Sequence, residues 1–190
     1  MKTLDEISPK YFTDKGSTSG DHNYLIAYEK YTSPMRVFAK NILEIGVASG
    51  ESMGLWNEYF INANIHGIDI TPELNGILEK PFRDTSKIQF HIGKQQDVKF
   101  LKTVVDSIGA PLDLIIDDGG HVPEQMIKSV MFLQNYLSPE GYYILEDIWV
   151  TTCDVFRDAI KKSDLEIVEE YSDSKREKGV WCMFVLRRRR

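Results

Sequence analysis

Short apolar, β-prone runs alternate with amphipathic stretches along most of this chain. The apolar runs span Asn41–Ile45, Asn64–Ile70, Lys87–Ile92, Leu112–Asp117 and Gly141–Glu146. Between them, apolar residues recur at intervals of three and four positions, which predicts helices at Glu51–Phe60, Asp97–Ile108 and Val122–Leu137. Strands that alternate with helices of this length are typical of βαβ units on a largely parallel sheet.

The pattern changes after Glu146. A helix is predicted at Thr152–Lys162, and two apolar runs follow at Leu165–Tyr171 and Val180–Leu186, separated by the charged turn Asp173–Gly179. Two strands with no helix between them must pair antiparallel. The sequence therefore predicts an α/β fold, Rossmann-like and doubly wound, with a mostly parallel seven-stranded sheet that ends in a C-terminal antiparallel hairpin.

The first forty residues differ in character from the rest. A polar, glycine-rich segment at Thr13–Asn23 precedes a predicted helix that carries Tyr24, Tyr28 and Tyr31. Such a segment forms either a lid over a cleft or a surface loop whose tyrosines pack on the sheet, and the sequence leaves both open. We predict one domain over residues 1–190, with an N-terminal segment at 1–40 and a core at 41–190.

Composition excludes some classes of function. The formal net charge of −6 argues against a nucleic-acid binder, and the one basic block, Arg187–Arg190, is predicted to be a solvated tail or the junction to a larger polypeptide. No apolar run approaches the ~18 residues of a membrane span. The first six residues, Met1–Glu6, lack the apolar core that a signal peptide has, and Cys153 and Cys182 are interpreted as reduced thiols. These features predict a soluble, cytoplasmic protein.

Two acidic clusters follow predicted strands: Asp117 and Asp118, with His121 close behind, and the pair Glu146 and Asp147. The carboxyl ends of parallel strands share one edge of a sheet, so these clusters should face one cleft. Converging carboxylates repel one another unless a cation intervenes, which predicts a divalent metal. Asp117 either contacts a cofactor or caps a helix, and His121 is either a functional residue or a loop histidine at a helix start.

A glycine turn follows the first predicted strand. Gly46 and Gly50 allow close backbone approach to a ligand, but their G-x-x-x-G spacing is not the dinucleotide fingerprint, and the preceding Glu44 would repel a pyrophosphate. This disfavours an NAD-linked oxidoreductase and favours a cationic ligand. Asp69 ends the next strand, where an acid binds a ribose diol in such sheets.

These motifs resemble a known family. Leu43–Gly50 with Asp69 resembles motif I and the ribose-binding acid of class I S-adenosylmethionine-dependent methyltransferases. Ile115–His121 with Leu145–Asp147 resembles the metal-dependent sugar O-methyltransferases of macrolide biosynthesis, and the likeness runs from about Thr13 to Leu186. The resemblance implies S-adenosylmethionine and Mg²⁺ as cofactors. It also implies that Asp118, Glu146 and Asp147 hold the metal and that His121 is the general base.

The resemblance extends to two further segments. Thr13–Gly16, with His22 and the two tyrosines that follow, resembles the part of the family that closes over the cofactor. Gly93–Asp97 resembles a Gly-Asp-Gln-x-Asp segment, from which Lys94 departs. Catalytic roles are thus predicted for His121 and Asp118, and the predicted cofactor-binding residues are Glu44, Gly46, Ser49, Gly50, Asp69, Gln95, Asp97, Asp117, Tyr24 and Tyr28.

The function that these expectations favour is Mg²⁺-dependent O-methylation of a sugar hydroxyl, on a deoxysugar either free or within a glycoconjugate. Three protein oxygens leave room in an octahedral shell for two vicinal hydroxyls and a water. A catechol-type methyltransferase is the alternative, with Trp149 and Trp56 either as walls for an aromatic acceptor or, equally, as core residues. A non-catalytic module that binds the cofactor is a second alternative. Because the related sugar enzymes form oligomers, a homo-oligomer stays open.

Overall fold

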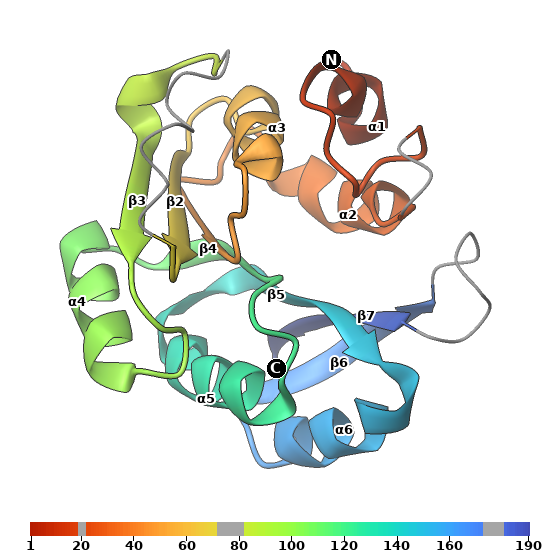
Figure 1. Ribbon diagram of the computed structural model, residues 1–190, viewed down its shortest axis with the longest axis vertical. Helices are drawn as coiled ribbons and strands as arrows, with labels where there is room; N and C mark the ends of the chain where they lie inside the picture. Colours follow the sequence, from red (N-terminus) through yellow and green to blue (C-terminus); the bar gives the residue numbers. More distant parts are fainter. Residues whose placement is uncertain (19–21, 72–81, 173–180) are drawn as a thin grey trace.

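The chain folds around one sheet with the strand order β3-β2-β1-β4-β5-β7-β6, in a computed structural model that describes residues 1–18, 22–71, 82–172 and 181–190 (Figure 1). Strands β1 to β5 run parallel, whereas β7 is antiparallel to both β5 and β6. This confirms the predicted Rossmann-like fold and its C-terminal antiparallel pair. The strands are β1 Asn41–Ile45, β2 Asn64–Asp69, β3 Ile88–Ile92, β4 Leu112–Asp117, β5 Leu137–Trp149, β6 Leu165–Ser172 and β7 Trp181–Arg188.

Helices cover both faces of the sheet. The helices are α1 Leu4–Ile7, α2 Leu25–Thr32, α3 Glu51–Tyr59, α4 Val98–Ile108, α5 Pro123–Leu133 and α6 Cys153–Lys161. Helices α1 to α3 lie on one face and α4 to α6 on the other (Figure 1). The predicted helix Val122–Leu137 is shorter than expected, because its last turn continues as a 3-10 helix at Gln134–Tyr136. The short α1 was not predicted.

The two faces carry two separate hydrophobic cores, as the alternation of side chains along each strand requires. In β1, which is buried along its whole length, Ile42 packs into the core under α1 to α3, whereas Leu43 and Ile45 pack into the core under α4 to α6. Because both faces of the parallel strands are covered, these strands are continuous apolar runs. The three-layer architecture leaves the carboxyl ends of the central strands as the place for a site.

Strand β5 is much longer than the predicted Gly141–Glu146. Its carboxyl end passes the end of β4 and stays paired with β7, where Ile148 lies opposite Cys182 and Trp149 opposite Trp181. The pairing is irregular between Leu145 and Ile148. An antiparallel neighbour therefore keeps residues beyond the parallel sheet in strand geometry.

The basic C-terminus is part of the sheet, so the prediction of a solvated tail was wrong for its first half. Arg187 belongs to β7 and donates a hydrogen bond at 2.7 Å to Glu166, the residue opposite it in β6. Arg188 donates to the backbone carbonyls of Gln134 and Leu137. Cross-strand charge pairs of this kind stabilise a sheet edge. The charged turn Asp173–Gly179 lies outside the described residues.

No helix in the described parts of the chain combines the length and the apolar character that crossing a membrane requires.

His66 is a buried histidine at the centre of β2. Its side chain stacks on His91 of β3 with ring centroids 5.8 Å apart, and neither ring nitrogen has a hydrogen-bond partner among the described residues. Burial lowers the pKa of the His66 imidazole to about 4. His66 is therefore a packing residue in the interior of the sheet.

We expect the pH dependence of stability to report this histidine. Above pH 6.5 the imidazole is neutral in both the folded and the unfolded chain, but between about pH 6.5 and 4 only the unfolded chain binds the proton. At pH 5, His66 should therefore lower the free energy of unfolding by about 2 kcal/mol relative to pH 7. Urea unfolding of the wild type and His66→Phe at both pH values measures this effect, which the substitution should remove. An equal loss in both proteins would contradict the assignment.

Candidate active site

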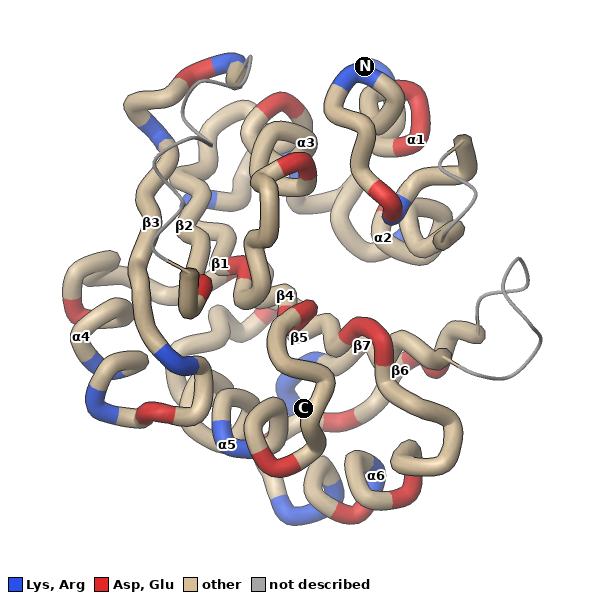
Figure 2. The backbone as a smooth tube through the Cα atoms, viewed as in Figure 1, with Lys and Arg blue, Asp and Glu red and all other residues tan. Residues whose placement is uncertain are grey.

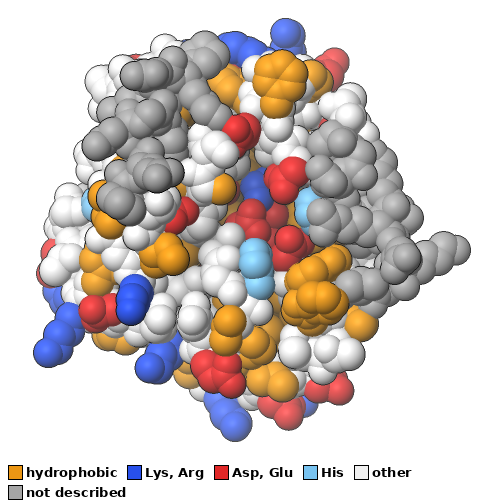
Figure 3. Space-filling view, viewed as in Figure 1, with side chains coloured by type: hydrophobic (Ala, Val, Ile, Leu, Met, Phe, Trp, Pro, Cys, Tyr) orange, Lys and Arg blue, Asp and Glu red, His pale blue; other side chains and the backbone are white. Residues whose placement is uncertain are grey.

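Acidic residues gather where the carboxyl ends of the central strands meet (Figure 2). Glu44 lies in β1, Asp118 directly follows β4, and Glu146 and Asp147 lie in the part of β5 that extends beyond Asp117. In the space-filling view, acidic and histidine side chains line a hollow on this face (Figure 3). The two predicted acidic clusters therefore do face one cleft.

The outer part of this cluster is formed by Asp118, His121 and Asp147. One potential ligand atom from each residue lies within 4.8 Å of the others, as a bound cation would require. Nδ1 of His121 is buried and has no hydrogen-bond partner among the described residues. His121 and Asp147 both have a φ of +50°, a backbone conformation that side-chain-bearing residues rarely adopt. Such strained positions concentrate at functional sites.

The inner part of the cluster is centred on Lys15. Its Nζ lies 2.5 Å from Asp118 Oδ2, 2.8 Å from Glu146 Oε2 and 4.0 Å from Glu44 Oε1, and its side chain is only 2% exposed. Burial alone would lower the pKa of the ammonium, but the attraction of the three carboxylates outweighs burial and raises that pKa well above its ordinary value. Sequence reasoning singled out the Thr13–Gly16 segment but missed this role of Lys15.

Glu146 is fully engaged within the protein. Its Oε2 accepts from Lys15, and its Oε1 accepts from the hydroxyl of Tyr28. Asp147, in contrast, accepts from the Tyr24 hydroxyl at 2.6 Å through one oxygen and remains part of the outer cluster. Of the two adjacent acids, Asp147 is therefore the one that faces the hollow.

Residues of the N-terminal segment donate hydrogen bonds to Glu146 and Asp147. Tyr24 and Tyr28 are completely buried, and His22 stacks on the Tyr24 ring with centroids 4.6 Å apart. Burial raises the pKa of both tyrosine hydroxyls, so both remain hydrogen-bond donors to the acids. The structure thus places both tyrosines on the carboxylates predicted to bind metal. Residues 19–21 of the preceding segment lie outside the described residues.

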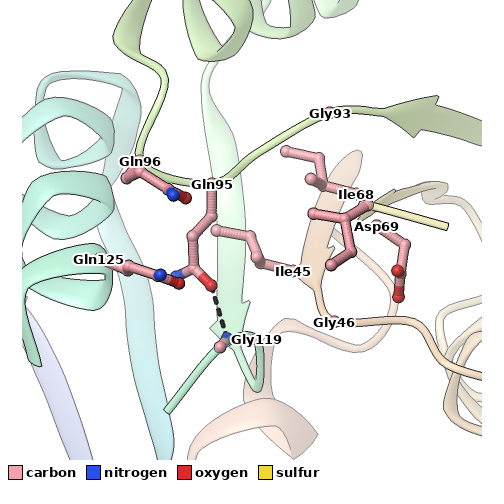
Figure 4. A pocket seen from close by; sticks show the side chains of 11 residues that line it. Ile45, Gly46, Ile68, Asp69, Gly93, Gln95, Gln96, Gly119 and Gln125 are labelled. Carbon is pink, nitrogen blue, oxygen red and sulfur yellow. Dashed lines mark hydrogen bonds between the residues drawn. The ribbon is translucent and has the colours of Figure 1, made fainter. Parts of the chain in front are cut away.

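A cavity of about 200 Å³ adjoins the cluster at the ends of β1 and β2 (Figure 4). Gly46, Asp69 and Gln95 are among its lining residues. Gly46 has a φ of +84°, and a Cβ at this position would lie 2.0 Å from the Asp118 carbonyl oxygen, so only glycine fits. Asp69 Oδ2 accepts hydrogen bonds from the backbone N–H groups of the glycine turn, those of Val47 at 2.9 Å and Ala48 at 3.0 Å.

Of the residues predicted to bind cofactor, only Gly46, Asp69 and Gln95 line this cavity; Asp117 and Asp97 are held elsewhere by contacts within the protein. Asp117 is fully buried behind Gln95, whose Nε2 donates to it at 2.9 Å, and burial raises the pKa of the Asp117 carboxyl to about 6. Adjacent strand residues point to opposite faces, so Asp117 points away from the side that Asp118 occupies. Asp97 caps α4, where its carboxylate accepts from the backbone N–H groups of Lys99 and Phe100.

A second cavity, of about 250 Å³, lies on the other side of Gly46. Its lining includes Lys15, Ser49 and Asp118. Glu44 is fully buried nearby and accepts from Ser52 Oγ and from the indole nitrogen of Trp56, and burial raises the pKa of its carboxyl to about 7. Gly50, with a φ of +82°, is the N-cap residue that precedes α3.

The structure decides between the two interpretations of Trp56. Its side chain is completely buried, and its ring packs against Tyr28 and Phe60. Trp56 therefore belongs to the core and cannot form a wall for an aromatic acceptor.

Comparison with known proteins places this site in context. No family model matches the chain. The 8-demethyl-8-alpha-L-rhamnosyl tetracenomycin-C 2'-O-methyltransferase of Streptomyces olivaceus is 31% identical over 147 residues, which cover 74% of this chain and 37% of the relative. The mycinamicin VI 2''-O-methyltransferase of Micromonospora griseorubida is 31% identical over 153 residues, covering 77% and 36%. The chain thus spans little more than a third of these relatives.

Solved structures share the fold. The MycE methyltransferase from the mycinamycin biosynthetic pathway, solved with Mg and SAH, superimposes with a TM-score of 0.76 and 24% identity over 98% of this chain and 55% of that one. A ribosomal protein L11 methylase from Lactobacillus delbrueckii gives a TM-score of 0.63 at 14% identity, over 87% and 78%. By sequence and fold, the chain belongs among the class I S-adenosylmethionine-dependent methyltransferases, as a relative of the macrolide and deoxysugar O-methyltransferases.

Proposed function

We propose that this chain transfers a methyl group from S-adenosylmethionine to a sugar hydroxyl with the help of Mg²⁺. The observation that carries the proposal is the outer cluster of Asp118, His121 and Asp147 beside two cavities that meet at Gly46. Two relatives are O-methyltransferases of a rhamnosyl tetracenomycin and of mycinamicin VI, which supports a glycoside as acceptor. An acidic edge also suits a cofactor whose reactive centre is a cationic sulfonium.

The two cavities match the two halves of the cofactor. Asp69 and Gln95 offer hydrogen-bonding groups to an adenosine in the first cavity. Ser49 and the backbone of the glycine turn line the second cavity, where the charged amino-acid half fits beside Asp118. Gly46 separates the two halves and permits close approach of a ligand to the backbone.

The outer cluster fits a divalent cation. We propose Asp118 and Asp147 as the carboxylate ligands, since Mg²⁺ prefers oxygen donors. Glu146, the third ligand that the resemblance implies, joins them only if Lys15 gives up its contact, because both carboxylate oxygens are already hydrogen-bonded. When bound, Mg²⁺ would lower the pKa of a sugar hydroxyl and fix its orientation.

His121 is proposed as the general base. It stands in the outer cluster, where an imidazole accepts the proton that the hydroxyl loses as its oxygen bonds to the methyl carbon. Asp118 and Asp147 lie beside His121 as the proposed metal ligands. Tyr24 donates a hydrogen bond to Asp147 and Tyr28 donates one to Glu146, and both buried rings shield the inner sides of these acids from water. The chain thus positions the reactants, and the sulfonium supplies the reactivity.

The first test is cofactor binding followed by transfer. We expect calorimetry to show binding of S-adenosylmethionine, and labelled methyl to pass to methyl α-L-rhamnopyranoside in Mg²⁺ but not in EDTA. Pyrocatechol in place of the glycoside tests the catechol alternative. Cofactor binding without transfer to either acceptor would favour the non-catalytic module, and no cofactor binding would overturn the proposal.

A comparison of the two adjacent acids tests the metal ligands. We expect Asp147→Asn to weaken Mn²⁺ binding on the order of 100-fold and Glu146→Gln to weaken it by roughly tenfold or less, because Glu146 supports the site from within. Electron paramagnetic resonance titration of free Mn²⁺ measures both affinities without turnover. Equal losses would show that Glu146 is a direct ligand and that Lys15 moves away when metal binds.

Removal of the buried cation should destabilise the fold. Lys15→Met leaves the buried Glu146 and the partly buried Asp118 without a counter-charge, which should cost about 3–5 kcal/mol of unfolding free energy. The matched control is Lys10→Met, which removes a half-exposed ion pair with Glu58 and should cost about 1 kcal/mol or less. Urea unfolding measures both, and added Mg²⁺ should stabilise Lys15→Met more than the wild type. Equal losses in the two variants would refute the role of Lys15.

A further inference from the structure

An aromatic pair stands at the edge of the outer cluster. Trp149 at the end of β5 and Trp181 at the start of β7 lie directly opposite each other, with ring centroids 4.0 Å apart. Residues paired in this way project from the same face of a sheet. Trp149 is 45% exposed, which is unusual for the largest side chain and contrasts with the fully buried Trp56.

The pair reaches the proposed base. The ring of Trp181 meets the ring of His121 edge to face, with centroids 6.4 Å apart. Trp149 follows Asp147 by two residues, and the irregular pairing of β5 between Leu145 and Ile148 lies between the parallel sheet and this end of the strand. Such irregularities often re-aim side chains beside active sites. Figure 3 shows hydrophobic side chains next to the acidic and histidine side chains of the hollow.

The two indole rings form a platform, by which we mean one exposed aromatic surface with no slot in it. Because the two rings contact each other, no slot for a flat aromatic ligand exists between them. Within the described residues, neither indole N–H donates a hydrogen bond to the protein. An exposed indole face beside a polar cluster offers apolar contact to one side of a ligand and leaves the ligand's polar edge free to reach the cluster.

We propose that Trp149, supported by Trp181, is the acceptor-binding platform of this site and stacks against the C–H face of a pyranose ring. This inference rests on the proposed function and names the part of the site that selects the acceptor. A deoxysugar has an apolar face of C–H groups and hydroxyls around its rim. Stacked on Trp149, it would direct those hydroxyls towards His121 and Asp147.

Substitutions at the platform test its role in acceptor binding. We expect Trp149→Ala to raise the KM for methyl α-L-rhamnopyranoside roughly tenfold, with kcat and the affinity for S-adenosylmethionine within about twofold of wild type. Trp149→Phe, which keeps an aromatic face, should recover most of the loss. The matched control is Phe38→Ala, which removes a 77% exposed aromatic side chain near the amino end of β1 and should leave KM unchanged.

A direct binding measurement separates this inference from the proposed function. Without S-adenosylmethionine, the glycoside should quench indole fluorescence saturably in the wild type and in Phe38→Ala, but not in Trp149→Ala. Methyl transfer with an unchanged KM in Trp149→Ala would overturn the platform and leave the proposed function intact. Saturable, Trp149-dependent quenching without any transfer would support the platform and count against the proposed function. No quenching in the wild type would overturn the platform.

Discussion

The ammonium of Lys15 allows three carboxylates to meet inside this protein. Glu44, Asp118 and Glu146 come from three neighbouring strand ends, and an oxygen of each lies within 4.0 Å of Lys15 Nζ. Two like charges about 4 Å apart repel by roughly 4 kcal/mol at an effective dielectric of 20, which is large beside the about 5–15 kcal/mol that stabilises a whole domain. The buried cation offsets this repulsion. Because Lys15 belongs to the N-terminal segment, that segment is an integral part of the site.

The contacts of Lys15 also separate acids that are bonded within the protein from acids that face the hollow. Lys15 and Tyr28 bond both oxygens of Glu146, whereas the bond from Lys15 to Asp118 goes to Oδ2. Asp118 and Asp147 are the two acids that also take part in the outer cluster. The positive φ values of His121 and Asp147 aim both residues at this outer cluster, at a cost that the surrounding packing has to bear. The proposed cation, entering from outside, would therefore meet ligand atoms that already lie within 4.8 Å of one another.

Much of this arrangement was predictable from local sequence. The apolar runs of β1 and β4 gave the parallel core, and the acids that follow β4 and lie in β5 gave the position of the site, because strand ends of a parallel sheet share one edge. The contacts of Lys15 were not predictable, since they join residues 103 and 131 positions apart. Asp117 shows another limit, because the face that a side chain takes depends on register, which a pair of adjacent acids does not reveal.

The length of β5 connects these observations. A strand that ended with its parallel neighbour β4 would stop near Leu145, short of both acids of the Glu146–Asp147 pair. Pairing with β7 carries the strand on to Trp149, so that one element supplies an inner acid, an outer acid and an exposed indole in sequence. The antiparallel strands β6 and β7 thus do more than complete the edge of the sheet. They extend β5 beyond the parallel sheet, and the proposed chemistry and the proposed acceptor platform both lie on that extension.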